Sequence, residues 1–154
     1  MGSKLRDIRA AVITAIAGVN GSGEYDHDLS GAGQVLHGRT GLPARLPAVL
    51  VFGASSATTR EDAQLGYLTR PHTWSIVGAV AAISTAPGDG EAEAEDLFDD
   101  ISRALEADPT LGDLVYDLSL SLDETWGADL NLEMLAGFGA TLTILRETAY
   151  GAGT

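Results

Sequence analysis

Residues 117–123 of the chain have the sequence Asp-Leu-Ser-Leu-Ser-Leu-Asp. Successive side chains of a strand point to opposite faces, so this alternation predicts a β-strand with one buried and one solvated face. Residues 134–145 have the same two-residue period, with several small residues at every second position. The two segments predict a sheet that packs a hydrophobic core against one of its faces.

Further strands are predicted before this pair. Pro47 precedes the continuous apolar run of residues 48–52, which predicts a central strand covered on both faces. Residues 64–70 and 72–83 are rich in β-forming side chains, and Pro71 between them predicts a kink or bulge that separates two strands.

Two longer segments have helical periodicity. Residues 4–18 carry apolar side chains at helical spacing, with Ser3 as the N-cap, and end at a glycine-rich turn over residues 20–23. Residues 97–105 predict a second helix, which should end before Pro109 because proline disfavours helical geometry in the preceding residue. Thr110, followed three residues later by Asp113, resembles a capping box and predicts a short helical turn through residue 115.

The order of these elements predicts an α+β fold, with helices packed on one face of a mostly antiparallel sheet. We expect a single domain over residues 1–150 and a frayed tail at 151–154. Residues 24–46 are rich in glycine and contain only short extended pieces, so they are expected to form a flexible arm or hairpin.

Composition excludes several classes of protein. The chain has 154 residues, no cysteine and a net charge of -13. Disulfides, thiolate metal sites and cysteine nucleophiles are therefore impossible, and such an acidic chain is a poor candidate for nucleic-acid binding. No apolar run approaches the ~20 residues of a membrane-spanning helix, so we expect no membrane association. The basic and then apolar N-terminus resembles a signal peptide, but its helical periodicity favours an amphipathic helix.

The negative charge is concentrated in one part of the chain. Residues 89–133 contain 15 carboxylates and a single basic side chain, Arg103, whereas the rest of the chain is close to neutral. One interpretation is an ordinary solvated face, with Glu91, Glu93 and Glu95 favoured by the dipole at the helix start. The other is a dedicated negative surface that repels polyanions or binds a basic partner.

The most metal-like motif is Tyr-Asp-His-Asp at residues 25–28, where two carboxylates flank an imidazole. The second half of a metal site is missing, because neither His37 nor His72 gives a recognised ligand spacing. A solvated arm is the competing interpretation. Ser55 and Ser56 lack the glycine context of a nucleophile elbow. We therefore assign no catalytic residue, no metal ligand and no cofactor.

The two tryptophans lie in different contexts. Trp74 lies in a predicted strand and is expected in the core, whereas Trp126 lies among acidic and small residues, where core packing and a partner contact remain equally open. The candidate subunit or partner interface comprises the following residues: Tyr25, Leu29, Val35, Leu36 and Trp126.

Three stretches carry a resemblance to a known family. They are residues 46–51 (Leu-Pro-Ala-Val-Leu-Val), 104–113 (Ala-Leu-Glu-Ala-Asp-Pro-Thr-Leu-Gly-Asp) and 115–117 (Val-Tyr-Asp). With the order of elements, they resemble the tail terminator, or tail completion, proteins of long-tailed bacteriophages and related tail-like particles. The resemblance covers most of the chain as an order of elements and is most specific over residues 97–122.

This resemblance implies a non-enzymatic virion protein at the head-proximal end of the tail, assembled in the host cytoplasm. Its implied partners are other copies of itself in a hexameric ring, the tail tube protein and the head-side connector protein. DNA would pass through the ring without being specifically bound, and Glu91, Glu93 and Glu95 are the candidate channel-facing residues. The alternatives are another head-tail joining component of the same particle, or a small metal-dependent enzyme or ligand-binding domain.

Overall fold

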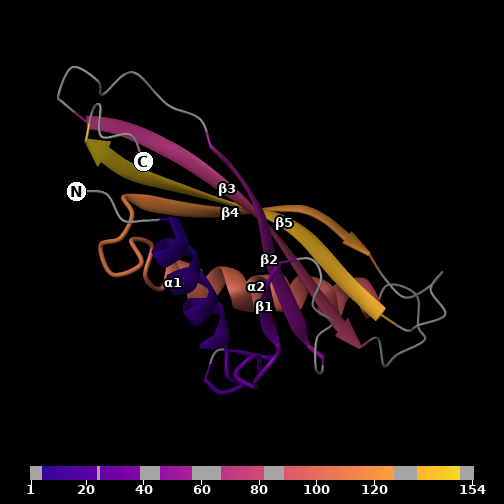
Figure 1. Cartoon of the computed structure of the whole chain (residues 1–154). Helices are drawn as coiled ribbons and strands as arrows, with labels where there is room; N and C mark the ends of the chain where they lie inside the picture. Colours follow the sequence, from indigo (N-terminus) through magenta and orange to yellow (C-terminus); the bar gives the residue numbers. More distant parts are fainter. Residues whose placement is uncertain are drawn as a thin grey trace.

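The structure is a computed structural model that describes residues 5–23, 25–38, 46–56, 67–81, 89–126 and 135–149 (Figure 1). For residues 54–56, 67–70, 89, 135 and 146–149 it describes the backbone alone. In chain order, the elements are α1 (Leu5–Ala17), β1 (Val35–His37), β2 (Ala48–Ser56), β3 (Tyr67–Ala81), α2 (Asp89–Glu106), β4 (Asp117–Trp126) and β5 (Leu135–Ala149).

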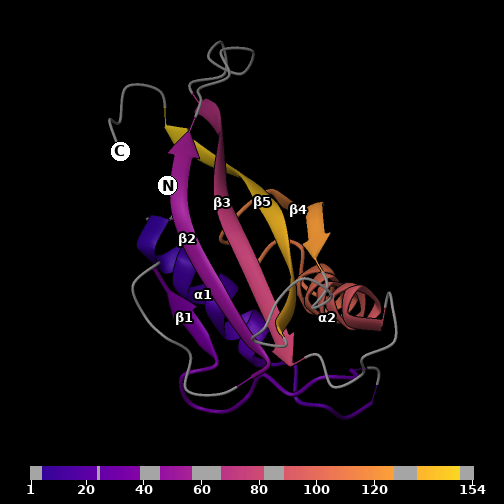
Figure 2. The same cartoon turned by 90° about the vertical axis from the view of Figure 1, so that its right-hand side faces the viewer.

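The five strands form one sheet in the order β1-β2-β3-β5-β4. β1 runs parallel to β2, and every other neighbouring pair is antiparallel. Both helices lie on the same side of the sheet (Figures 1 and 2), with α1 beside β1 and α2 across β3, β5 and β4. The expected α+β class, with helices on one face of a mostly antiparallel sheet, is confirmed.

α1 is an amphipathic helix that belongs to the core. Ile8, Val12 and Ile16 recur one turn apart and are fully buried, so each contributes roughly 1.5–3 kcal/mol of apolar burial. The helix ends at Ala17, and in the turn that follows Gly21 and Gly23 adopt positive φ, a conformation that glycine tolerates without steric cost. The N-terminal segment is therefore a structural helix of the domain, as its periodicity predicted.

α2 covers the other half of the sheet. Its buried apolar residues face β5, where the Phe98 and Phe138 rings meet edge to face with their centroids 5.5 Å apart. Beneath this contact, a Cβ on Gly78 would overlap the Phe138 ring. The lack of a side chain at Gly78 therefore leaves room for the Phe138 ring against β3. This explains why a glycine stands in a strand of β-forming residues.

β2 differs from the prediction of a strand covered on both faces. Val49 and Val51 are fully buried under the helices, but Leu50 and Phe52 on the opposite face are only half-buried. Among the described elements, no helix lies over that opposite face (Figure 2). β2 is also the second strand of the sheet rather than its centre.

The prediction of two strands separated at Pro71 is wrong, because β3 runs unbroken through the proline. β3 pairs with β5 along its whole length, with Pro71 opposite Leu145, whereas its pairing with β2 begins only at His72. Among the described residues, no β2 residue pairs with Pro71, so the missing N–H removes no ladder hydrogen bond to that strand.

The described part of the predicted arm does not form a hairpin. Residues 35–37 form β1, which pairs parallel with β2, and Asp28 makes only an isolated bridge to Asn20. Leu29 and Gln34 are buried, so the segment packs on the domain between α1 and β1. Glu24 and residues 39–45, also assigned to the arm, lie outside the described residues, as does the tail at 151–154.

Two local predictions in the C-terminal half also need correction. Residues 110–115 form turns instead of a helical turn, with positive φ at Leu111, Gly112 and Asp113, although the Thr110 hydroxyl does accept the Asp113 N–H. In β4, Leu118 is buried as the alternation predicted, but Leu122 is 41% exposed. A register shift between Leu122 and Glu124 follows directly after this leucine.

Candidate functional site

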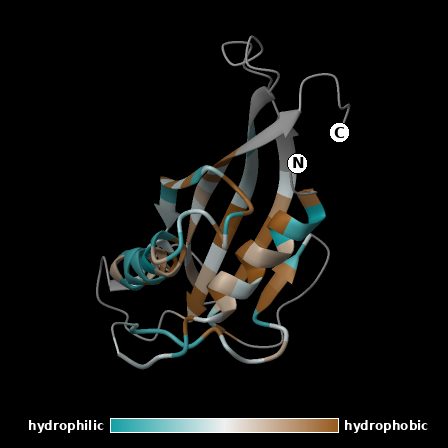
Figure 3. Cartoon of the chain, turned by 90° about the vertical axis from the view of Figure 1, so that its left-hand side faces the viewer, coloured by the Kyte–Doolittle hydropathy of each residue, from teal (hydrophilic) through white to brown (hydrophobic). Residues whose placement is uncertain are grey.

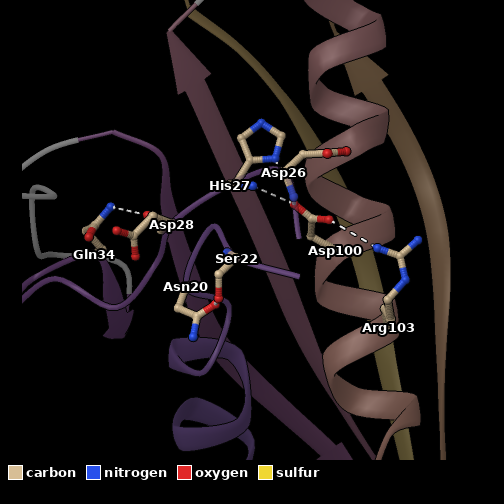
Figure 4. Close-up of polar contacts among 8 residues, drawn as sticks. All are labelled: Asn20, Ser22, Asp26, His27, Asp28, Gln34, Asp100 and Arg103. Atoms are coloured by element: carbon tan, nitrogen blue, oxygen red, sulfur yellow. Dashed lines mark hydrogen bonds and ion pairs between the residues drawn. The ribbon is translucent and has the colours of Figure 1, made fainter. Parts of the chain in front are cut away.

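A polar cluster joins the segment after α1 to α2 (Figure 4). Its centre is the Asp100 carboxylate on α2, whose side chain is only 1% exposed. Asp100 Oδ2 accepts the backbone N–H groups of Asp26 at 3.0 Å and His27 at 2.9 Å, and lies 2.9 Å from His27 Nδ1. Asp100 Oδ1 lies 3.4 Å from an Arg103 guanidinium nitrogen. Both oxygens of the buried carboxylate therefore have donors, as a desolvated charge requires.

The position of Asp100 explains the cluster. It lies three residues after Leu97 and four before Ala104, both buried, so the apolar stripe of α2 carries a carboxylate into the interior. Two consecutive backbone N–H groups at residues 26 and 27 converge on it, a geometry that suits an anion. The cluster thus connects two segments 73 residues apart in the chain.

A second set of hydrogen bonds fixes the chain beyond His27. Asp28 Oδ1 accepts the N–H and hydroxyl of Ser30. The buried Gln34 amide donates to the carbonyls of Asp28 and Pro47 at 2.9 Å each and accepts the Gly31 N–H at 2.8 Å. Gln34 thereby links the segment after α1 to the start of β2. These are bonds that order a loop.

The carboxylates around His27 do not converge as the metal interpretation would require. The ring Nδ1 is directed to Asp100, while Asp28 bonds Ser30, and among the described residues no group of three His, Asp or Glu side chains is placed to hold a metal ion. His37 is exposed at the end of β1 and His72 is buried in β3, so the structure does not bring the three histidines together.

The candidate channel-facing residues lie in the first turns of α2, but they do not share one face. Glu91 and Glu95 are one turn apart and exposed, whereas Glu93 is half-buried. Asp96 and Asp99 continue the exposed side of the helix, which Figure 3 draws mostly in the hydrophilic colour. None of these five side chains forms an ion pair with any residue that the structure describes.

The sheet face opposite the helices has an aromatic residue at one end. Trp126 pairs with Gly137 across β4 and β5, and a Cβ on Gly137 would meet the indole Cζ2 at 2.5 Å. A Cβ on Gly139 would likewise contact the Glu124 side chain, with a carboxylate oxygen at 3.3 Å. Trp126 is half-buried, so the structure places it on the sheet surface with part of its ring accessible.

The other interface candidates lie in different environments. Tyr25, Val35 and Leu36 are half-buried, and the first two pack against the core. Leu29 is 0% exposed within the core, where its N–H donates to the Val19 carbonyl at 2.7 Å. In this structure Leu29 therefore has no surface to offer a partner. Trp74 is buried, in agreement with its predicted core position.

Asp100 was missed by the sequence-based choice of site residues. The available signal was its position on the apolar stripe of a predicted helix, because a buried carboxylate must find donors elsewhere in the chain. Asp100 binds the backbone N–H groups of residues 26 and 27, and because every non-proline residue has such a group, the sequence does not indicate which of them will be the donors.

Comparison with known proteins assigns no family. No protein-family model matches the sequence, and no curated protein matches it. In the described part of the chain, neither helix has the length and apolar character needed to cross a bilayer.

Proposed function

We propose that this protein is a structural virion subunit that caps the tail tube of a long-tailed phage or related tail-like particle. Copies of the chain form a hexameric ring, end the polymerisation of the tube and provide the surface that joins tail to head. The proposal starts from the sequence resemblance over residues 97–122, which correspond to the second half of α2, the turns after it and the first half of β4.

The observation that carries the proposal is the segregation of charge onto one element. α2 carries eight carboxylates against one arginine. Among the seven whose side chains the structure describes, Asp100 is the one that is buried and forms ion pairs. A net charge of magnitude ~2–8 suffices to keep a small domain soluble. The excess at α2 is therefore available for a role between molecules, such as shaping the field inside a ring.

The architecture supports an assembly role in a second way. The sheet face opposite the helices has half-buried apolar side chains, including Leu50 and Val77, and no described helix covers them. Apolar surface of this kind marks sites of contact with other proteins. A subunit with this face on one side and two helices on the other has separate surfaces for a tube, a connector and neighbouring copies.

Within the ring, we place Glu91, Glu93 and Glu95 near the DNA channel. Six copies of this cluster would surround the channel with negative potential, so that DNA would be repelled from the wall and could slide. The protein would thus conduct DNA without binding it specifically.

The test is reconstitution. Purified protein is examined by native mass spectrometry and negative-stain imaging, then added to polymerising tail tubes. We expect six-fold rings and tubes of shortened, uniform length with a ring at one end. Rings that bind the connector but leave tube growth unchanged would identify another joining component, and a protein that binds neither would refute the proposal.

A further inference from the structure

The two helices differ in charge and lie on opposite flanks of the same sheet face. α1 lies beside the edge strand β1, and α2 lies toward the edge strand β4 (Figure 2). α1 carries two arginines and one aspartate, in contrast to the eight carboxylates and one arginine of α2. The order of the strands therefore places the more basic helix and the acidic helix on different sides of the subunit.

Several charges on these helices form no ion pair with a residue that the structure describes. Arg6 is exposed and Arg9 is half-buried on α1, and neither forms an ion pair with a described residue. Asp96 and Asp99 on α2 are both exposed and equally unpaired. Within the described residues, the α2 carboxylate that forms ion pairs is the buried Asp100, with His27 and Arg103.

The spacing of the two pairs matches. Arg6 and Arg9 are three residues apart, as are Asp96 and Asp99, and residues at this spacing are neighbours on a helix surface. Each helix can thus offer two like charges one turn apart to a helix of opposite charge. Asp7, between the two arginines in sequence, lies about 100° around the helix from Arg6 and about 160° from Arg9.

We propose that the α1 flank of one copy docks on the α2 flank of the next, with Arg6 and Arg9 facing Asp96 and Asp99. This inference rests on the ring proposed above and specifies its subunit contact. Because the two flanks are different surfaces, the contact is heterologous, and a heterologous contact forms a closed ring when the rotation between successive copies divides a full turn. Each copy has a net charge of -13, so close approach of two copies needs local complementarity of this kind.

Charge exchange tests the contact. The variants are R6E/R9E, D96K/D99K and the fourfold combination, which keeps the wild-type net charge. The matched control is D117K/E124K, which makes the same charge change as D96K/D99K at exposed positions of β4. Circular dichroism establishes that each variant folds, and native mass spectrometry with light scattering measures assembly over a range of concentrations.

We expect each of the two double variants to weaken assembly by about 10- to 100-fold, since attraction becomes repulsion at two sites. The control should assemble like wild type, and the fourfold variant should regain the ring. A mixture of the two double variants should form rings of alternating composition, which gives a second route to rescue if the fourfold variant does not fold.

The outcomes separate this inference from the proposed function. The proposed contact would be overturned if rings persist in R6E/R9E or D96K/D99K, or if they are lost equally in the control. In either case the ring formed by the wild-type protein would still support the proposed function. The same holds if neither the folded fourfold variant nor the mixture assembles. Wild-type protein that never forms rings or caps tubes would overturn the proposed function and this contact together.

Discussion

Asp100 Oδ2 lies 2.9 Å from both the backbone nitrogen and the Nδ1 atom of His27, a residue 73 positions earlier in the chain. One buried oxygen thereby holds the start of the segment that leads from α1 into the sheet. The contribution of this contact can be measured by substitution and by hydrogen exchange.

Replacing Asp100 with Ala should destabilise the fold by about 2–4 kcal/mol, because donors at Asp26 and His27 would lose their buried acceptor. Asp100→Asn keeps an acceptor oxygen and should cost less. Urea denaturation gives the free energies of unfolding. The matched control is Asp99→Ala, an exposed neighbour on the same helix, which should change stability by less than ~0.5 kcal/mol. Equal effects at the two positions would contradict the role of Asp100.

Hydrogen exchange should detect the same connection residue by residue. In the monomer, the amides of Asp26 and His27 should be protected, and Asp100→Ala should accelerate their exchange selectively. The Leu29 amide donates to the Val19 carbonyl and should respond less, which makes it an internal control. Fast exchange of all three amides in the wild-type monomer would instead support the flexible arm that the sequence suggested.

Gly137→Ala should destabilise the domain by about 1–3 kcal/mol, because the added methyl would overlap the indole of Trp126 and the Gly78 carbonyl. Displacement of the indole should move its fluorescence emission to longer wavelength. The measurement is made in a Trp74→Phe background so that a single tryptophan reports. Gly139→Ala is the control, since its methyl would meet only the movable Glu124 side chain. An unshifted spectrum with unchanged stability would contradict the described packing.

The proposed channel position of Glu91, Glu93 and Glu95 predicts a functional defect without loss of fold. Converting all three to Lys should cost about 1–2 kcal/mol through the helix dipole. Particles should assemble tails of normal length but retain or release DNA abnormally, with a defect that weakens as salt screens the charges.

The control for this variant reverses three exposed carboxylates elsewhere in the acidic region: Glu106, Asp108 and Asp117. Normal DNA delivery by the helix-start variant at every ionic strength would indicate an ordinary solvated face. A defect of equal size in the control would indicate an effect of total charge.

Much of the fold was predictable because hydrophobic period is a local property. The alternation at residues 117–123 and 134–145 predicted β4 and β5, and the helical spacing of Ile8, Val12 and Ile16 predicted α1. Pro71 was misinterpreted because its tolerance depends on where the neighbouring strand β2 ends, which a single segment does not encode.

The polar cluster was much less accessible to sequence analysis. Tyr-Asp-His-Asp at residues 25–28 attracted attention as a possible metal site, yet the residue that organises it lies on α2 and acts through backbone donors. Similarly, glycines at residues 31 and 33 suggested a loose arm, whereas burial of Leu29 and Gln34 fixes this segment on the domain. Such contacts arise only when segments distant in sequence are brought together.

The register shift in β4 determines which side of the sheet each later residue faces. Before it, Leu118 and Leu120 pair with Ile144 and Leu142 on the helix side. After it, Trp126 pairs with Gly137 on the opposite side, although its number is also even. One extra residue has therefore changed the parity of the strand. Deleting Asp123 would remove that extra residue and leave Thr125 opposite Phe138 and Trp126 opposite Gly137, on their present faces of a regular ladder. The extra residue therefore accounts for the even number of Trp126, and the pairing with Gly137 fixes the indole on the outer surface.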